Sequence, residues 1–362
     1  MNATIHRATK AMRFKALALV VLMATATSCR DESSMTPNLR WKQLPSIPDP
    51  EGFATPFAGV SGGALIVAGG ANITGDKWKD PFTKKWYDTA FVLERPDGAW
   101  RGGFKLPRAI GYGMSVTADD GVICIGGSDA TRHYADVFRL AWVNGELKAT
   151  LLPALPKPCA NTCGALLGRT VYVAGGIETP TATTALRTFW ALNLDDATPR
   201  WRELEPWPGP ERMLAVAGAQ DGSFFLFSGT KLKADADGKP ARAYLRDAYR
   251  YTPGRGWKRI ADLPRAAVAA PSPAVPFGAS GLLVFTGDDG ANVTFKPVER
   301  HPGFPRDVLL YNVASDSWRA AGEASFSRAT VPVVKWGDRF VIPNGEVRPR
   351  VRTPEVWALE LP

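Results

Sequence analysis

A short apolar strand that ends in glycine recurs six times along the chain, and this repeat limits the fold more than any other feature. Its last glycine falls at residues 70, 127, 176, 229, 287 and 345, with spacings of 49 to 58 residues. Repeats of this length, built from a few short strands, are typical of the blades of a β-propeller. Glycine and proline contribute 35 and 30 of the 362 residues, too many for a helical bundle.

Two other strands accompany each glycine strand. One is opened by a tryptophan and ends near a proline, and the examples begin at Trp100, Trp201, Trp257 and Trp318. The unit at residues 147–156 lacks this tryptophan. A further strand lies between the two markers, at residues 90–93, 136–140, 189–192, 248–251 and 308–311. With the strand that precedes each glycine strand, every unit has four strands, and six units predict six blades.

The two ends of the chain predict how the ring closes. The sixth unit ends with its third strand at residues 356–359, and its missing tryptophan strand stands at residues 41–45. We therefore expect an all-β, six-bladed kelch-type β-propeller over residues 41–362, in which the N-terminal strand completes the C-terminal blade. Such closure removes open sheet edges. No pattern indicates a second domain.

Residues 1–28 have the features of an export signal. Four basic residues precede the apolar stretch 16–23, which is too short to span a bilayer. The small residues 26–28 followed by Cys29 resemble the lipobox of bacterial lipoproteins. We expect a lipidated Cys29, a tether over residues 29–40 and a periplasmic, membrane-anchored protein. Ordinary cleavage near Ser28 and a start at Met12 remain alternatives.

Cysteine and histidine usage limits the chemistry. Besides Cys29 the chain has Cys124, Cys159 and Cys163, an odd number that permits at most one disulfide. We expect all three to be small buried residues. Only His133 and His301 lie outside the leader, which excludes a histidine-rich metal site. No metal or other cofactor is expected.

The charge balance suits a small anionic ligand. Of the 44 Lys and Arg residues four lie in the leader, which leaves 40 against 35 acidic residues, a net charge of +5. This mild excess, without a basic run interleaved with aromatic residues, does not call for a nucleic-acid partner.

Blade topology predicts one face on which charged residues gather. The residues after each glycine strand share a face with the residues before each first strand. The first group is Asn72, Asp129, Glu178, Lys231, Asp288 and Glu346, and the second is Arg108, Lys157, Arg212, Arg265 and Arg328. The long segments 72–87, 230–246 and 288–305 lie on the same face, as loops that build binding sites often do. The alternative is that these charges pair to tie blades together.

The stretch Asn344-Gly-Glu-Val-Arg-Pro-Arg-Val-Arg-Thr353 is the richest in chemistry. It places Glu346 beside Arg348, Arg350 and Arg352. Guanidinium forks match carboxylate ligands, and positive charge favours the ionised form of a carboxylate that acts as a base. A solvated basic loop is the alternative.

This stretch and the repeat order resemble the bacterial kelch-repeat family of N-acetylneuraminate epimerases, or sialic acid mutarotases, in a cyclically permuted form. In the enterobacterial type the segment Asn-Gly-Glu-x-Lys-Pro-Gly-x-Arg-Thr sits in mid-chain, followed by a Trp strand and a Gly-Gly-Ala strand. Here its equivalent is nearly C-terminal, and the continuation lies at residues 41–72. Because a propeller is a ring, starting and ending the chain at a different blade leaves the same face intact.

The resemblance implies roles for individual residues. Glu346 matches the family's proposed proton acceptor. Substrate contacts are expected from Arg352, Arg348, Arg108, Arg328, Tyr112 and Asn72. The chain departs from the family in having Arg348 for Lys, Arg350 for Gly and Asp129 for Glu.

The implied activity is that of a cofactor-free isomerase acting on a small sugar acid, with no obligate protein partner. A base takes the proton of the anomeric hydroxyl, an acid protonates the ring oxygen, and the opened ring recloses on the other face. Two alternatives stay open: a non-enzymatic kelch module that binds a glycan or a protein, and a mutarotase or epimerase of another sugar. A sialidase would carry Ser-x-Asp-x-Gly-x-x-Trp boxes, which the sequence lacks.

Overall fold

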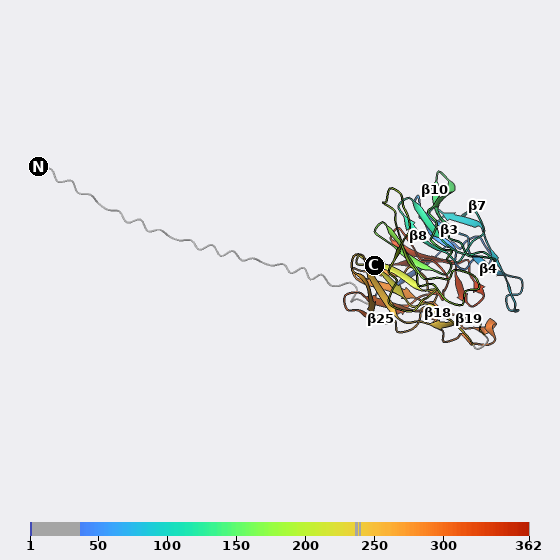
Figure 1. Ribbon diagram of the computed structural model, residues 1–362. Coiled ribbons are helices and arrows are strands. Elements are labelled where there is room, and N and C mark those ends of the chain that lie inside the picture. Colours follow the sequence, from blue (N-terminus) through green and yellow to red (C-terminus); the bar gives the residue numbers. More distant parts are fainter. Residues whose placement is uncertain (2–36, 236–237, 239, 362) are drawn as a thin grey trace. The chain divides into compact units, whose positions relative to one another are not determined.

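The computed structural model describes Met1, residues 37–235, Gly238 and residues 240–361. The described residues from 37 onward include six four-stranded antiparallel sheets, and the predicted six-bladed propeller is confirmed. Figure 1 shows how these strands are arranged. The expected export signal, Cys29 and most of the expected tether lie outside the described residues. Among the described residues, no helix has the length and apolar character needed to cross a membrane.

The blades follow one another along the chain. Blade 1 consists of β2 (Phe57–Ser61), β3 (Ala64–Ala68), β6 (Thr89–Leu93) and β7 (Arg101–Lys105). Blade 2 consists of β8 (Met114–Ala118), β9 (Gly121–Ile125), β10 (Val137–Val143) and β11 (Glu146–Leu152). Blade 3 consists of β12 (Cys163–Leu167), β13 (Thr170–Ala174), β14 (Phe189–Asn193) and β15 (Arg202–Leu204).

The second half of the ring repeats this order. Blade 4 consists of β16 (Val216–Gln220), β17 (Ser223–Phe227), β20 (Ala248–Thr252) and β21 (Gly256–Ile260). Blade 5 consists of β22 (Val275–Phe277), β23 (Gly281–Phe285), β24 (Asp307–Asn312) and β25 (Ser317–Glu323). Blade 6 consists of β26 (Val334–Trp336), β27 (Arg339–Pro343), β30 (Val356–Glu360) and β1 (Arg40–Leu44).

Three small hairpins interrupt the connections between second and third strands. They are β4 (Ala71–Thr74) with β5 (Thr83–Trp86), β18 (Thr230–Ala234) with β19 (Pro240–Tyr244), and β28 (Glu346–Arg348) with β29 (Val351–Arg352). They belong to blades 1, 4 and 6, respectively. Figure 1 labels β4 in the first and both strands of the second. In blade 5 the same connection carries a 3₁₀ turn, η2 (Val298–Arg300). The sequence predicted long segments at residues 72–87, 230–246 and 288–305, but not the strands within the first two or the hairpin of blade 6.

In every blade except blade 2, a recurring tryptophan ties the blade to the one before it. The indole N–H of Trp41 in β1 donates to the carbonyl of Glu323 in blade 5 at 3.3 Å, while β1 pairs with β30. The equivalent indoles donate to the carbonyls of Pro45, Pro153, Glu205 and Ala261 at 2.8–2.9 Å, from Trp100, Trp201, Trp257 and Trp318. The predicted closure of the ring by its N-terminal strand is thereby confirmed.

The hydrophobic core lies between neighbouring blades. Every residue of β3, β9, β17 and β23 is buried, because these second strands are covered on both faces. Cys124, Cys159 and Cys163 are free and buried, as predicted. Burial raises the pKa of the Cys159 and Cys163 thiols to about 12, which keeps both protonated and unreactive.

Glycine is required after each second strand by backbone conformation and by space. Gly176 has φ +106°, and a β-carbon there would lie 2.5 Å from the Cys159 sulfur and 2.7 Å from the Ala160 carbonyl oxygen. Gly70 and Gly127 have similar φ values of +95° and +112°. Only glycine adopts such angles without strain.

Replacing Gly176 by alanine should therefore lower the free energy of unfolding by about 2–5 kcal/mol, the combined cost of backbone strain and overpacking. The matched control is Gly63→Ala, where φ is +77° but no atom lies within 4 Å of the added β-carbon. Its expected cost is about 1–2 kcal/mol. Urea unfolding measures both, and equal losses would contradict the steric argument.

Candidate active site

A repeated backbone bridge defines one end of the channel. In every blade, a residue three to seven positions before the first strand pairs with the residue just after the second-strand glycine. The pairs are Ala54–Ala71, Gly111–Ser128, Ala160–Ile177, Met213–Thr230, Val268–Asp288 and Ala329–Glu346. These pairs bring the two predicted groups of residues onto one face. Of the six residues on the glycine side, only Asp288 and Glu346 are acidic, and they belong to neighbouring blades.

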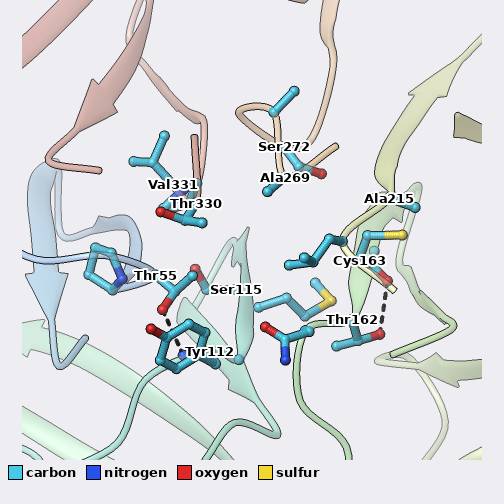
Figure 2. Close-up of a pocket in the computed structure, with 18 residues that line it drawn as sticks. Thr55, Tyr112, Ser115, Thr162, Cys163, Ala215, Ala269, Ser272, Thr330 and Val331 are labelled. Atoms are coloured by element: carbon cyan, nitrogen blue, oxygen red, sulfur yellow. Dashed lines mark hydrogen bonds between the residues drawn. The ribbon is translucent and has the colours of Figure 1, made fainter. Parts of the chain in front are cut away.

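The next residue of each blade joins a closed ring of hydrogen bonds, which we call the collar. Its members are Thr55, Tyr112, Asn161, Leu214, Ala269 and Thr330, all with φ between +49° and +60°. Each N–H donates to the carbonyl of the preceding member, at 2.6–3.3 Å, and Thr55 closes the ring on Thr330. Figure 2 shows four of them, Thr55, Tyr112, Ala269 and Thr330, arranged around the channel. The closed ring of hydrogen bonds holds these six non-glycine residues in the left-handed region, which an isolated residue would rarely adopt.

A pocket of about 240 Å³ lies against the collar. Its walls come from five collar residues and from all three small hairpins. The charged side chains that line it are Lys84, Arg242, Asp288, Glu346, Arg350 and Arg352. All six blades contribute, so the site exists only in the closed ring.

Glu346 begins β28, and its carboxylate is held by three groups. Its Oε1 lies 3.1 Å from Nη2 of Arg352 and accepts the backbone N–H of Arg350 at 3.2 Å. The Thr330 hydroxyl donates to Oε2 at 3.4 Å. The side chain is 16% exposed, so the carboxylate is oriented yet reachable from the pocket.

Arg352 lies opposite Glu346 in the hairpin and is 8% exposed. Its Nε and Nη1 are buried and have no hydrogen-bond partner among the described residues. Buried donors without partners are costly, so such groups usually meet an ordered water or a ligand oxygen. The pair therefore offers an acceptor beside unsatisfied cationic donors.

Tyr112 and Asn72 have different places. Tyr112 is a collar residue that lines the pocket, with the Lys84 amine 5.1 Å from its ring centre. Asn72 is buried, and its amide donates to the Gly52 carbonyl at 2.7 Å while its oxygen accepts the Ile73 N–H. Asn72 does not line the pocket, because both the nitrogen and the oxygen of its side-chain amide are hydrogen-bonded to backbone groups.

Arg108 and Arg328, expected to contact substrate, instead form ion pairs within their own blades. Arg108 lies 3.0 Å from Asp136, and the fully buried Arg328 lies 2.9 Å from Glu355. Arg212–Asp247 and Arg265–Asp307 repeat this arrangement at 2.6 and 2.8 Å. In each pair the acidic residue lies at the start of the third strand or directly before it. These arginines are therefore structural, which was the alternative that the sequence left open. Each ion pair lies within one blade, however, and does not join two blades.

Arg348 also points away from the pocket. Its Nη1 donates to the Glu299 carbonyl at 2.5 Å, and its guanidinium lies 5.6 Å from the Trp78 ring centre. Arg350, in contrast, lines the pocket and has φ +71°. A left-handed residue at this turn explains why the motif that the sequence resembles carries glycine there.

Of the charged side chains that line the pocket, Lys84 and Arg242 were not singled out from the sequence, and Asp288 was placed on this face without a role. Lys84 and Arg242 lie on the second strands of their hairpins. Asp288 accepts the Tyr244 hydroxyl at 2.5 Å, and burial together with this carboxylate raises the pKa of Tyr244. In the sequence, Asp288 could be recognised because it directly follows a glycine strand. No local sequence feature distinguished Lys84 or Arg242. Within the described part of the chain, no cluster of three or more His, Cys, Asp or Glu side chains could hold a metal.

The fold and pocket define a propeller protein with a mixed cationic and acidic site at one end of its channel. The family model of N-acetylneuraminate epimerase matches residues 24–149 and 152–287, and the chain belongs to this family. The N-acetylneuraminate epimerase of Haemophilus influenzae strain PittEE is 30% identical over 233 residues, 57% of this chain and 58% of that protein. The one from Yersinia enterocolitica is 29% identical over 245 residues, 61% and 59% of the two chains.

The chain thus spans somewhat under two thirds of the length of these relatives. The solved structure titled "Structure of YjhT" shares the fold, with TM-score 0.62, 14% identity, and coverage of 86% of this chain and 95% of that one. The family match ends at residue 287, before Glu346 and Arg352. The case for these two residues therefore comes from their motif and their geometry.

Proposed function

We propose that this protein is an isomerase that interconverts the anomers of N-acetylneuraminate, exported and anchored to the membrane through Cys29. The observation that carries the activity is the Glu346–Arg352 pair, 3.1 Å apart, in which two buried guanidinium nitrogens have no hydrogen-bond partner among the described residues. An acidic sugar presents a carboxylate to such donors and a hydroxyl to such an acceptor. Membership of the N-acetylneuraminate epimerase family supports this choice of sugar.

In the proposed mechanism Glu346 is the general base. Its carboxylate takes the proton from the anomeric hydroxyl, the carbonyl at C2 forms, and the bond from C2 to the ring oxygen breaks. The ring oxygen takes up a proton, delivered by the same carboxyl group or through water. Reversal on the other face of C2 gives the second anomer, and Glu346 ends ionised as it began.

Arg352 is the proposed clamp for the sugar's carboxylate. Charge-assisted hydrogen bonds to a buried guanidinium are stronger than neutral ones, and they fix the sugar while the geometry at C2 changes. Tyr112 and Asp288 line the same pocket and are the proposed partners of the sugar's hydroxyl and amide groups.

The test is time-resolved proton NMR on freshly released α-N-acetylneuraminate. We expect the protein to speed the approach to the β anomer well above the rate in buffer at the same pH. A folded protein that gives no acceleration would overturn the proposal, and a panel of other sugar acids and neutral sugars would follow.

Arg352→Lys should raise KM by about 10–100-fold, because one ammonium cannot replace the guanidinium fork. The matched control is Arg108→Lys, in which the altered cation contacts Asp136 rather than the pocket. Its KM should stay within about twofold of wild type. Similar KM values for the two variants would remove Arg352 from the clamp.

A further inference from the structure

We propose that Arg350 is a positioning residue that straps the β4–β5 hairpin across the site, so that Phe82 and Lys84 form a wall of the substrate pocket. The part of this inference that concerns substrate rests on the proposed function. The strap itself rests on contacts between blade 6 and blade 1.

One side chain makes three contacts with the connection between β4 and β5. Nη2 of Arg350 lies 2.6 Å from Oδ1 of Asp80, and Nη1 donates to the Lys77 carbonyl at 3.1 Å. The guanidinium carbon lies 4.5 Å from the centre of the Phe82 ring. The Arg350 side chain is only 18% exposed, whereas its ion-pair partner Asp80 is 67% exposed, so the contacts with the Lys77 carbonyl and the Phe82 ring add to an ion pair that water partly screens.

The backbone of the same residue orients the proposed base. The Arg350 N–H donates to Oε1 of Glu346, and φ is +71°. Glycine would adopt this conformation more easily, so the arginine side chain is not needed for the turn. What the arginine side chain provides beyond a glycine is its contacts with Asp80 and Phe82.

The strapped hairpin brings a second cation to the pocket. Phe82 and Lys84 both line it, and the Lys84 amine lies 5.1 Å from the Tyr112 ring centre. Lys84 forms no ion pair with the described residues, so its charge is free to face an anionic ligand. A sugar acid would then lie between Arg352 on blade 6 and Lys84 on blade 1.

Two variants release the strap from opposite ends. Arg350→Gly removes the side chain, keeps the N–H to Glu346 and relieves the left-handed backbone. Asp80→Asn removes the partner charge. The matched control is Lys79→Ala in the same connection, whose side chain is 82% exposed and pairs only with Asp76 of that connection.

Two measurements on the full protein decide the matter: amide hydrogen exchange of residues 73–84, and the mutarotation kinetics of N-acetylneuraminate. Arg350→Gly and Asp80→Asn should each speed exchange in this segment by about tenfold or more. They should raise KM about five- to twentyfold with kcat within about twofold, while Lys79→Ala changes neither.

The outcomes separate the strap from the proposed function. Unchanged exchange in Arg350→Gly would overturn the strap, and faster exchange with unchanged KM would overturn the role of the wall. If wild type gave no mutarotation, the proposed function would fail. Exchange would still decide the strap, and equilibrium binding of the sugar acid, followed by tryptophan fluorescence, would decide the wall.

Discussion

Replacing Glu346 by glutamine is expected to lower kcat for anomer interconversion by about 10²–10⁴-fold, the contribution of a positioned general base. The amide keeps the size of the side chain and can still accept hydrogen bonds from Arg352 and Arg350. It cannot take the proton of the anomeric hydroxyl. KM should therefore change far less than kcat, which the NMR assay at several sugar concentrations will show.

The matched control is Asp288→Asn, at the equivalent bridge position of the neighbouring blade. Asp288 is also a carboxylate that lines the pocket, but it accepts the Tyr244 hydroxyl and lies on another blade from Arg352. We expect its loss to act mainly on KM. If Asp288→Asn abolished turnover while Glu346→Gln retained it, the base would have to be reassigned to Asp288.

Replacing Asp247 by asparagine is expected to lower the free energy of unfolding by about 3–5 kcal/mol, the usual cost of removing one partner from a buried ion pair. Arg212 has no exposed side-chain area, and its Nη2 lies 2.6 Å from Oδ2 of Asp247. The Tyr249 hydroxyl donates to the same oxygen at 2.6 Å. The variant leaves a buried guanidinium without its counter-charge.

Glu146→Gln is the matched control for this second prediction. Glu146 pairs with Lys148 at 3.5 Å, and the two side chains are 71% and 60% exposed. Water screens such a pair, so its loss should cost no more than about 0.5 kcal/mol. Urea unfolding compares the two variants, and a similar loss in both would mean that burial does not set the strength of the Arg212–Asp247 pair.

The sequence alone determined the blade count, the position of each second strand and the closure of the ring. These features follow from short-range rules. An apolar strand is followed by glycine where the backbone needs a positive φ, as at Gly176. A tryptophan in an outer strand donates its indole N–H to a carbonyl, as Trp318 does to Ala261. The sequence also placed Glu346 and Arg352 in one short motif, and the structure sets them opposite each other across a hairpin.

Only the tertiary structure showed which charged side chains line the pocket. The sequence does not distinguish Arg328 from Arg352. Arg328 pairs with Glu355 inside its blade, whereas Arg352 faces Glu346 and has two guanidinium nitrogens with no partner in the described part of the chain. Lys84 and Asp288 are about 200 residues apart and line the same pocket. These two residues lie in one pocket only because six blades close into a ring. The collar, which holds Tyr112 at a positive φ, depends on the same closure. No local pattern in the chain encodes that geometry.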